Sequence, residues 1–539
     1  MTTLADSPPA EKARRRRGAS SVAVGILLSR IAGLVRERVF AHFFGTSLYA
    51  DAWRAALRMP NVLQNLLGEG TLSASFIPIY AELLEEEREE AAARFAGAIL
   101  GLLLVTLGAL TVVGVLAAPY LVALFFMGFD PERQALTVAL VRILFPMAAL
   151  LVLSAWALGI LNSHRHFFIS YVAPVFWNLT MIGTLVALGS YLAFSDADLV
   201  IALGWGALVG GAVQLAVQLP FVFRLLPAFL PRVSLAVHGV REAIRNFFPV
   251  LAGRGVVNLS AWLDYALAAF LATGAVASLG YAQTLHLLPI SLFAMSIAAS
   301  ELPELSRTRS AGTSPIAREV SRALERVSFF LIPSTLAYLF FGDVIVAAIF
   351  QTGEFGATET LQTYAVLAAY ALGLPASSAS RVLSSAYYAL RDTGTPARIA
   401  AGRVAISLVL GAALMFPLDE IAVGEEARLG AAGLALGASA AAWVELFLLR
   451  HRLRRRIGEH GFSRSRLLRI VAAGATGSAI GFLALGVLEG LHPLLVAPGT
   501  LLPFGVAYLG SAHLLGVGLP LGALLGRSSG DEGGPTQSP

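Results

Sequence analysis

The stretch from Ser29 to Tyr80 places many ionisable side chains in an apolar background. Arginine is suited to phosphate binding, because its planar, permanently charged guanidinium donates two parallel hydrogen bonds. An ionisable group at bilayer depth costs about 2.5–3.5 kcal/mol, so each one needs a partner or a water-filled cavity. The sequence therefore predicts a polar chamber between helices. The charged residues of this stretch are Arg30, Arg36, Glu37, Arg38, Asp51, Arg54, Arg58 and Glu69.

The spacing of these charges permits two interpretations. Arg30 and Arg36 are six positions apart, about 600° of helical rotation, so they can line one broad face of a helix. Arg36 would then bind phosphate, and Asp51 or Glu69 of the neighbouring helix would tune its charge. Alternatively, the same charges form internal salt bridges or reach the membrane surface from the helix ends. Arg54 and Arg58, one turn apart, fit either interpretation.

The elements that must position these residues are transmembrane helices. The mean hydropathy is +0.73, with 57% hydrophobic and 14% charged residues, whereas soluble domains hold about 25% charged residues. Apolar runs of about 20 residues or more recur along the chain, and each can cross the hydrocarbon core as a helix. We therefore expect an all-α polytopic membrane protein with about fourteen transmembrane helices. Pro60, which has no backbone N–H, is expected to break the second helix.

The charges outside the helices indicate how the chain is oriented. Arginines gather in alternate loops, as the positive-inside rule requires when both termini are cytoplasmic. The net charge of +5 therefore reflects topology, and no nucleic-acid partner is expected. The absence of cysteine excludes disulfides and thiolate metal sites. The expected regions are a cytoplasmic basic tail at 1–18, an N-terminal bundle at 19–226, a second bundle at 227–416 with a polar inside linker at 306–326, a C-terminal helix pair at 417–526 and a disordered tail at 527–539.

The opening hairpin resembles that of the MurJ (MviN) family of lipid II flippases, and weaker similarities cover nearly all of the chain. This resemblance implies two bundles around a central cationic cavity, as in the multidrug/oligosaccharidyl-lipid/polysaccharide exporter superfamily. It also implies outward movement of lipid II, an undecaprenyl-pyrophosphate-linked peptidoglycan precursor, across the bacterial inner membrane by alternating access. The residues that carry the resemblance are Ser29-Arg30, Gly33, Arg36-Glu37, Phe44-Gly45, Asp51-Ala52, Pro60-Asn61, Glu69-Gly70 and Ser75-Phe76-Ile77-Pro78.

By this resemblance, Arg30, Arg36 and Asp51 match family positions needed for flipping, and Glu37 replaces the usual aspartate. The chain also departs from the family in two places. Where relatives carry an arginine pair it has Gln64 and Asn65, and where they carry an Asp-Arg pair it has Gln283-Thr284. Substitute groups for the lost arginine are Arg254 and His286, although a lone histidine in an apolar helix more often packs through a hydrogen bond.

Asp264 is a candidate Na⁺ or H⁺ site, because a buried carboxylate beside amide oxygens suits a cation. Some relatives bind sodium with an aspartate in this helix and polar groups in the eleventh. Here the eleventh helix offers only Arg403 and Ser407, so sodium coupling is weakly supported. Arg381 and Glu301 are further intramembrane charges that would form a structural pair.

The sequence contains no enzyme motif: neither a phosphate-cradling glycine-rich lysine loop, nor paired metal-binding histidines, nor a nucleophile elbow. We therefore expect no catalysis and no cofactor. Transport would depend on a Na⁺ or H⁺ gradient, the membrane potential or the substrate gradient, and the partners would be the substrate and membrane lipids. Three alternatives remain at this point: a flippase for another polyprenyl-linked glycan, an ion-coupled small-molecule exporter, and a non-transporting membrane scaffold.

Overall fold

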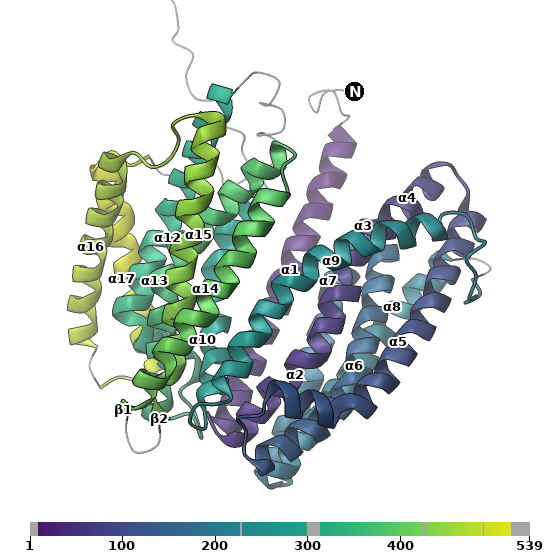
Figure 1. Ribbon diagram of the computed structural model, residues 1–539, viewed down its shortest axis with the longest axis horizontal. Coiled ribbons are helices and arrows are strands. Elements are labelled where there is room, and N and C mark those ends of the chain that lie inside the picture. The colour runs from purple at the N-terminus through teal and green to yellow at the C-terminus, as the bar shows by residue number, and fades with distance from the viewer. Residues whose placement is uncertain (1–8, 227–228, 299–312, 424–426, 489, 519–539) are drawn as a thin grey trace, which may run out of the picture. The chain divides into compact units, whose positions relative to one another are not determined.

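The protein folds into two compact units of helices, seen in the computed structural model (Figure 1). Unit 1 runs to Gly280 and includes the segments 352–359 and 424–428, and unit 2 contains the remainder. The structure describes residues 9–226, 229–298, 313–423, 427–488 and 490–518. Within these ranges it does not describe the side chains of residues 9–23, 69, 249–261, 313–314, 423 and 427.

Unit 1 is built from long apolar helices joined by short turns. Its elements are α1 (Pro9–Phe44), α2 (Leu48–Leu67), α3 (Glu69–Ser75), α4 (Ile77–Glu85), α5 (Glu89–Phe125), α6 (Pro131–Ser163), α7 (Phe167–Leu185) with the π-helical turn η1 (Val186–Tyr191), α8 (Asp196–Leu225), α9 (Val240–Ala268) and the start of α10 (Ala275–Pro289). Helix starts follow local rules: the Asp130 carboxylate accepts from the Arg133 N–H to cap α6, and Pro131 occupies its first turn.

The expected break of the second helix at Pro60 is wrong. Helix α2 continues through Pro60 and ends at Gly68, where the backbone is extended with ψ −150°. A proline removes only one backbone hydrogen bond. In a membrane protein, neighbouring helices can supply another partner for the backbone group that this leaves free. At Gly68, by contrast, a Cβ atom would collide with the carbonyl oxygen of Gln64. The extended backbone at Gly68, rather than the missing N–H at Pro60, therefore ends the helix.

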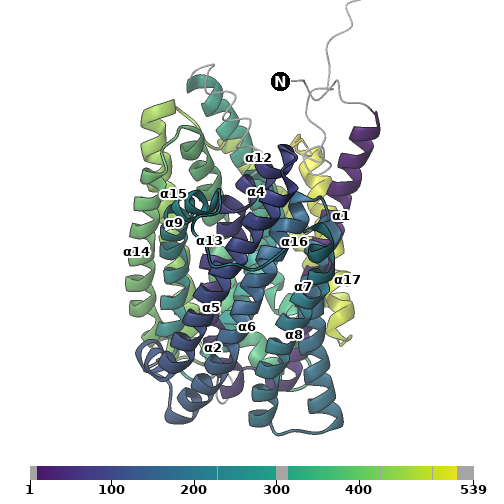
Figure 2. The same cartoon turned by 90° about the vertical axis from the view of Figure 1, so that its right-hand side faces the viewer.

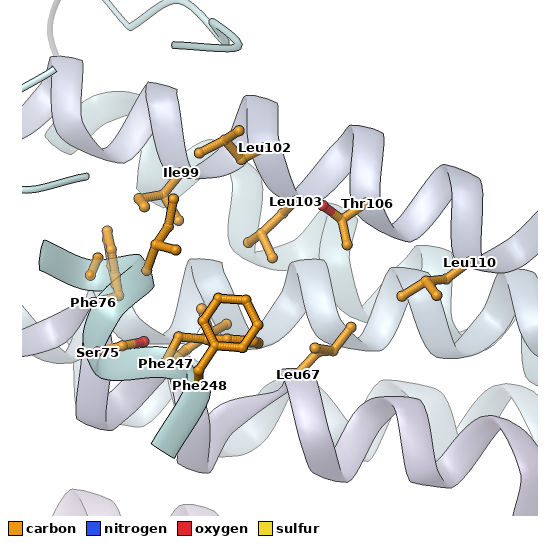
Figure 3. A pocket seen from close by; sticks show the side chains of 13 residues that line it. Leu67, Ser75, Phe76, Ile99, Leu102, Leu103, Thr106, Leu110, Phe247 and Phe248 are labelled. Atoms are coloured by element: carbon orange, nitrogen blue, oxygen red, sulfur yellow. The ribbon is translucent and has the colours of Figure 1, made fainter. Parts of the chain in front are cut away.

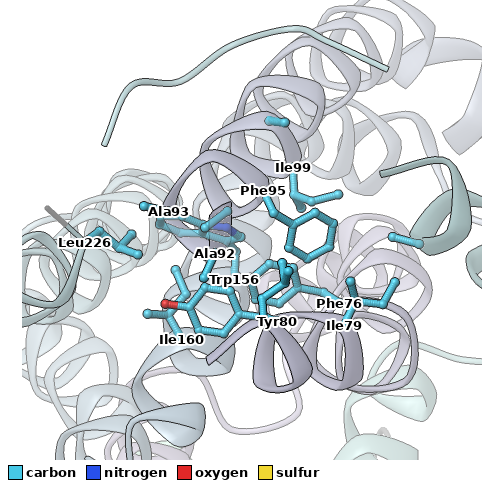
Figure 4. Packing of buried hydrophobic residues seen from close by; sticks show 14 of the residues in the cluster. Phe76, Ile79, Tyr80, Ala92, Ala93, Phe95, Ile99, Trp156, Ile160 and Leu226 are labelled. Atoms are coloured by element: carbon cyan, nitrogen blue, oxygen red, sulfur yellow. The ribbon is translucent and has the colours of Figure 1, made fainter. Parts of the chain in front are cut away.

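An aromatic cluster holds the end of unit 1 where α3 and α4 meet α5 and α6 (Figure 4). The Phe76 ring stacks on the rings of Tyr80 and Phe95, with centroids 5.3 and 5.4 Å apart. Trp156 of α6 is fully buried beside them. The cluster extends to Leu226 and to the first turn of α9, so it fixes the short α3 and α4 segments onto the long helices.

Helix α9 packs against α2, α3 and α5, and the compact unit that contains these helices extends to Gly280. The expected boundary at 226 stays a prediction. The segment from 229 to 232, between α8 and α9, runs along α5, where the Arg232 N–H donates to the Gly97 carbonyl oxygen at 3.2 Å. The tail, linker and C-terminal regions expected from the sequence stay predictions.

Unit 2 contains paired helices. Its elements are the remainder of α10, the π-helical turn η2 (Ile290–Ala294), α12 (Thr313–Phe350), α13 (Ala357–Ala389), α14 (Gly394–Asp419), α15 (Gly430–Ile457), α16 (Arg464–Val487) and α17 (Pro493–Leu514). Figures 1 and 2 show α14 beside α15 and α16 beside α17, and both members of the second pair contact α12. The only strands among the described residues are the two-residue β1 (Ala422–Val423) and β2 (Ala427–Arg428).

The contact between α14 and α15 depends on glycine, and replacing Gly437 with valine is expected to destabilise it. A Cβ at Gly437 would collide with the backbone of Gly411, and overpacking of this kind costs about 1–3 kcal/mol. The matched control is Gly402→Val, because the Cβ of Gly402 would meet nothing within 4 Å. Thermal unfolding of the purified proteins in detergent should show a lower Tm for Gly437→Val alone. Equal Tm values for the two variants would contradict the packing assignment.

The all-α membrane class expected from the sequence is confirmed. Among the described residues, eleven helices are long and apolar enough to cross a membrane. The helices α1, α2 and α9, which carry most of the candidate site residues, are not among these eleven. The expected number of about fourteen transmembrane helices stays a prediction.

Candidate substrate-binding site

The centre of the candidate site is an ion cluster between α1 and α2. Arg36 Nη2 donates to Glu37 Oε1 at 2.5 Å, and Arg54 Nη2 donates to Glu37 Oε2. One carboxylate thus lies between two guanidinium groups, which leaves one net positive charge in the cluster. The Arg36 side chain is 18% exposed, compared with 8% for Glu37 and 10% for Arg54. Arg36 is therefore the member best placed to contact a ligand.

Aromatic rings and a glycine position the two arginines. The Arg36 guanidinium lies 5.1 Å from the ring centre of Trp177 on α7, and that of Arg54 lies 5.2 Å from the ring centre of Phe40 on α1. Gly280 leaves the space that Arg54 occupies, because a Cβ there would lie 2.9 Å from the Arg54 Nε atom. Glu37 and Arg54 are thus a structural support for Arg36, held from α1, α2 and α10.

Asp51 takes part in a different network, in which it is fully buried. Its carboxylate accepts hydrogen bonds from the backbone N–H groups of Gly274 and Ala277, both at 2.8 Å. Arg133 Nη1 donates to the same carboxylate at 3.3 Å and is itself bound to Asp130 through Nε at 2.5 Å. Asp51 therefore caps the start of α10 and ties it to α2 and α6.

The turn between α1 and α2 is fixed by a distant segment of unit 1. The Glu354 N–H donates to the His42 carbonyl oxygen at 2.9 Å, and His42 Nδ1 lies 2.9 Å from Thr352 Oγ1. Gly45 has a φ of +50°, and a Cβ there would lie 2.5 Å from the Glu354 carbonyl oxygen. The turn at 352–356 therefore sets the angle at which the two charged helices diverge.

The remaining predicted residues of α1, α2 and α9 lie in several environments. Arg58 is half-buried, with its guanidinium 4.0 Å from the ring centre of Tyr265 on α9. Arg30 and Asn65 are exposed, and Gln64 is half-buried. The side chains of Glu69 and Arg254 lie outside the part that the structure describes.

The predicted residues Gln283 and His286 meet in unit 2 on Tyr370 of α13. Gln283 Nε2 donates to the Tyr370 hydroxyl at 3.1 Å, and the His286 ring stacks on the Tyr370 ring with centroids 5.1 Å apart. The His286 ring thus packs against an aromatic side chain, and a role of His286 in substrate binding stays a prediction. Asp264 is half-buried on α9, and no group of three or more His, Asp or Glu residues among those described is placed to hold a metal ion. The prediction of a cation site at Asp264 stays a prediction.

The sequence did not reveal two of the ionic contacts. Arg133 lies in the first turn of α6, and its side chain reaches the buried Asp51 of α2, 82 positions away. Arg403 of α14 forms an ion pair with Glu445 of α15 at 3.1 Å, although the two residues are 42 positions apart. The sequence signal for the second contact was one intramembrane charge on each of two consecutive helices, Arg403 and Glu445. Sequence spacing alone, however, does not show which residues of two helices meet.

An apolar groove of about 410 Å³ lies in unit 1 between α2, α3, α5 and α9 (Figure 3). Among the described side chains that line it, only Ser75 and Thr106 carry an oxygen, and the Phe247 and Phe248 rings form one wall. Such a surface fits hydrocarbon rather than a charged headgroup.

A family model described as "Lipid II flippase MurJ" matches residues 40–497. The chain belongs to the lipid II flippase MurJ family. A probable lipid II flippase MurJ of Rhizobium tropici is 32% identical over 484 residues, or 88% of this chain and 87% of the relative. The lipid II flippase MurJ of Burkholderia cenocepacia is 33% identical over 440 residues, or 80% and 82% of the two chains. The family resemblance carried by the opening hairpin is thus confirmed.

Solved structures have the same fold. One described as "Lipid II flippase MurJ, inward closed conformation" aligns with a TM-score of 0.73 at 24% identity, covering 92% of this chain and 98% of that one. An inward-facing MATE family transporter of the MOP superfamily aligns with a TM-score of 0.64 at 15% identity, covering 79% and 94%. Membership of the MurJ family and the many apolar helices make this a multi-pass protein of the bacterial inner membrane.

Proposed function

We propose that the protein moves lipid II from the inner to the outer leaflet of the inner membrane by alternating access, with both termini in the cytoplasm. The observation that carries the proposal is the buried Arg36–Glu37–Arg54 cluster, with its one net positive charge. The lipid II headgroup is joined to its polyprenyl chain through a diphosphate, and a guanidinium in a site of low dielectric attracts that group more strongly than in water.

Within this proposal the candidate residues have different roles. Arg36 contacts the diphosphate, while Glu37 and Arg54 hold Arg36 in position. Arg30, Arg58, Gln64 and Asn65 contribute further polar groups along α1 and α2. Asp51 acts indirectly, because the three donors on its carboxylate are already used to fix α10.

The decisive experiment is rescue of a bacterial strain depleted of its own lipid II flippase. The protein is expected to restore growth and normal cell shape, because it belongs to the lipid II flippase family and retains the cationic cluster. Expression in the membrane is verified by immunoblot, and an empty vector is the control. Failure to rescue with verified expression would contradict lipid II as the substrate and favour another polyprenyl-linked glycan, since Gln283 and Thr284 stand where relatives have charges.

A further inference from the structure

The apolar groove of unit 1 has one closed end and one open side (Figure 3). Its closed end lies at Phe76, which belongs to the aromatic cluster. Its open side lies at Thr106 and Phe248, because both residues line the groove and are nevertheless exposed. Helix α5 lines it from Ile99 to Leu110, eleven positions at 1.5 Å per residue, so the groove is about 16 Å long.

The length of the groove is that of one lipid leaflet. The hydrocarbon core of a bilayer is about 30 Å thick, so each leaflet contributes about 15 Å. A single acyl chain of a phospholipid spans one leaflet, whereas a polyprenyl chain is much longer than this groove. The dimensions therefore favour an acyl chain over the polyprenyl chain of a lipid-linked substrate.

Two arginines lie beside the groove on α9. Arg241 and Arg245 are one helical turn apart, on either side of the groove residue Ile244, and Arg245 lies one turn before Phe248. Both arginines are exposed, and neither guanidinium has a hydrogen bond or an ion pair among the described residues. Glu242, the one acidic residue in the first two turns of α9, is paired with neither. These two turns therefore carry one net positive charge.

The arginines lie toward the closed end of the groove. Val240 and Ala243, in the first turn of α9, pack with Phe95 and Ile99 in the aromatic cluster. One turn later, Phe247 packs in a separate apolar cluster with Leu107 of α5. The groove thus begins beside two cations and continues along a purely apolar wall. This sequence of surfaces is complementary to an anionic amphiphile, since paired guanidiniums bind phosphate oxygens and the apolar wall takes up hydrocarbon.

We propose that unit 1 binds one anionic phospholipid, with an acyl chain in the groove and its phosphate on Arg241 and Arg245. Basic pockets between transmembrane helices bind anionic lipid headgroups in this way. The phospholipid is a resident ligand and not the transported molecule, so the inference goes beyond the proposed function and does not depend on the substrate.

The test counts the lipids bound to the purified protein by native mass spectrometry in detergent, with phosphatidylglycerol and phosphatidylcholine as probes. The wild type is expected to bind one phosphatidylglycerol about tenfold more tightly than phosphatidylcholine, whose choline group offsets the phosphate charge. The double variant Arg241→Gln/Arg245→Gln is expected to lose this preference. The matched control is Arg232→Gln, because Arg232 is exposed and its backbone lies against Gly101, on the opposite face of α5 from Ile99.

A second pair of variants tests the groove itself. Thr106→Phe places a ring in the groove, so it is expected to weaken the binding of both phospholipids about tenfold. Val105→Phe adds the same ring at a neighbouring exposed position that does not line the groove, and it is expected to leave the affinity unchanged. Thermal unfolding of both variants checks that they are folded.

Wild-type preference for phosphatidylglycerol in the double arginine variant, or wild-type affinity in Thr106→Phe, would overturn the proposal. An equal loss in Arg232→Gln would also overturn it, because the attraction would then come from surface charge in general. Lipid II and the dimer fraction are measured in the same spectra. If Thr106→Phe weakens lipid II binding and leaves phosphatidylglycerol unaffected, the groove holds the polyprenyl chain. If it instead removes a dimer, the groove holds a second copy of the chain, and in either case the phospholipid is rejected.

Discussion

The Arg36→Ala variant is expected to fail to rescue a strain depleted of its lipid II flippase, although it reaches the membrane in normal amounts. Arg36 is the most exposed member of the ion cluster, and its loss leaves Glu37 bound to Arg54 with no net positive charge. A hydrogen bond to a charged group contributes about 1.5–3 kcal/mol. Loss of that contact corresponds to an increase of roughly tenfold to a hundredfold in the Kd for lipid II.

The measurement combines growth rescue with lipid II binding to the purified protein. The control is Arg88→Ala, which removes an exposed arginine paired with Glu86 on the surface. Arg36→Lys should retain part of the binding, since it keeps the charge but loses the bidentate geometry. Full rescue by Arg36→Ala would show that the cluster is a structural salt bridge, as the scaffold interpretation requires.

The Asp51→Ala variant is expected to unfold at a clearly lower temperature than the wild type. Its carboxylate is fully buried and accepts from Gly274, Ala277 and Arg133, so alanine leaves all three donors without this acceptor. Removing one partner of a buried ion pair costs about 3–5 kcal/mol. Asp51→Asn keeps an acceptor oxygen in nearly the same shape, so its loss of stability should be smaller.

Thermal unfolding in detergent and lipid II binding together separate the two roles proposed for Asp51. If Asp51 only caps α10, the Asp51→Asn protein that remains folded binds lipid II with nearly the affinity of the wild type. A large loss of affinity in folded Asp51→Asn protein, with an unchanged Tm, would instead support the direct substrate contact that the family resemblance implies. Arg36→Ala should show the reverse pattern, with weak binding and little change in Tm.

The membrane class and the position of the charged hairpin were predictable from the sequence, because hydropathy and charge are local properties of each segment. The family was also recognisable from short motifs that follow one another along the chain, such as Arg36-Glu37 and Asp51-Ala52. Likewise, apolar runs dictate helices in a membrane, since backbone groups have no water to bind there. Where a helix ends was less predictable: Pro60 lies inside α2, which ends only where the backbone becomes extended at Gly68.

Only the tertiary structure decided which charges meet. The sequence suggested Asp51 or Glu69 as the group that tunes Arg36, whereas in the structure Glu37 of α1 lies between Arg36 and Arg54. Asp51 accepts from a backbone N–H 226 positions away, and no periodicity in the sequence links the two. In unit 2, Arg403 finds Glu445 while Arg381 remains without an ion pair among the described residues. Side-chain pairing across helices depends on helix rotation and depth, which are properties of the packed bundle rather than of any one segment.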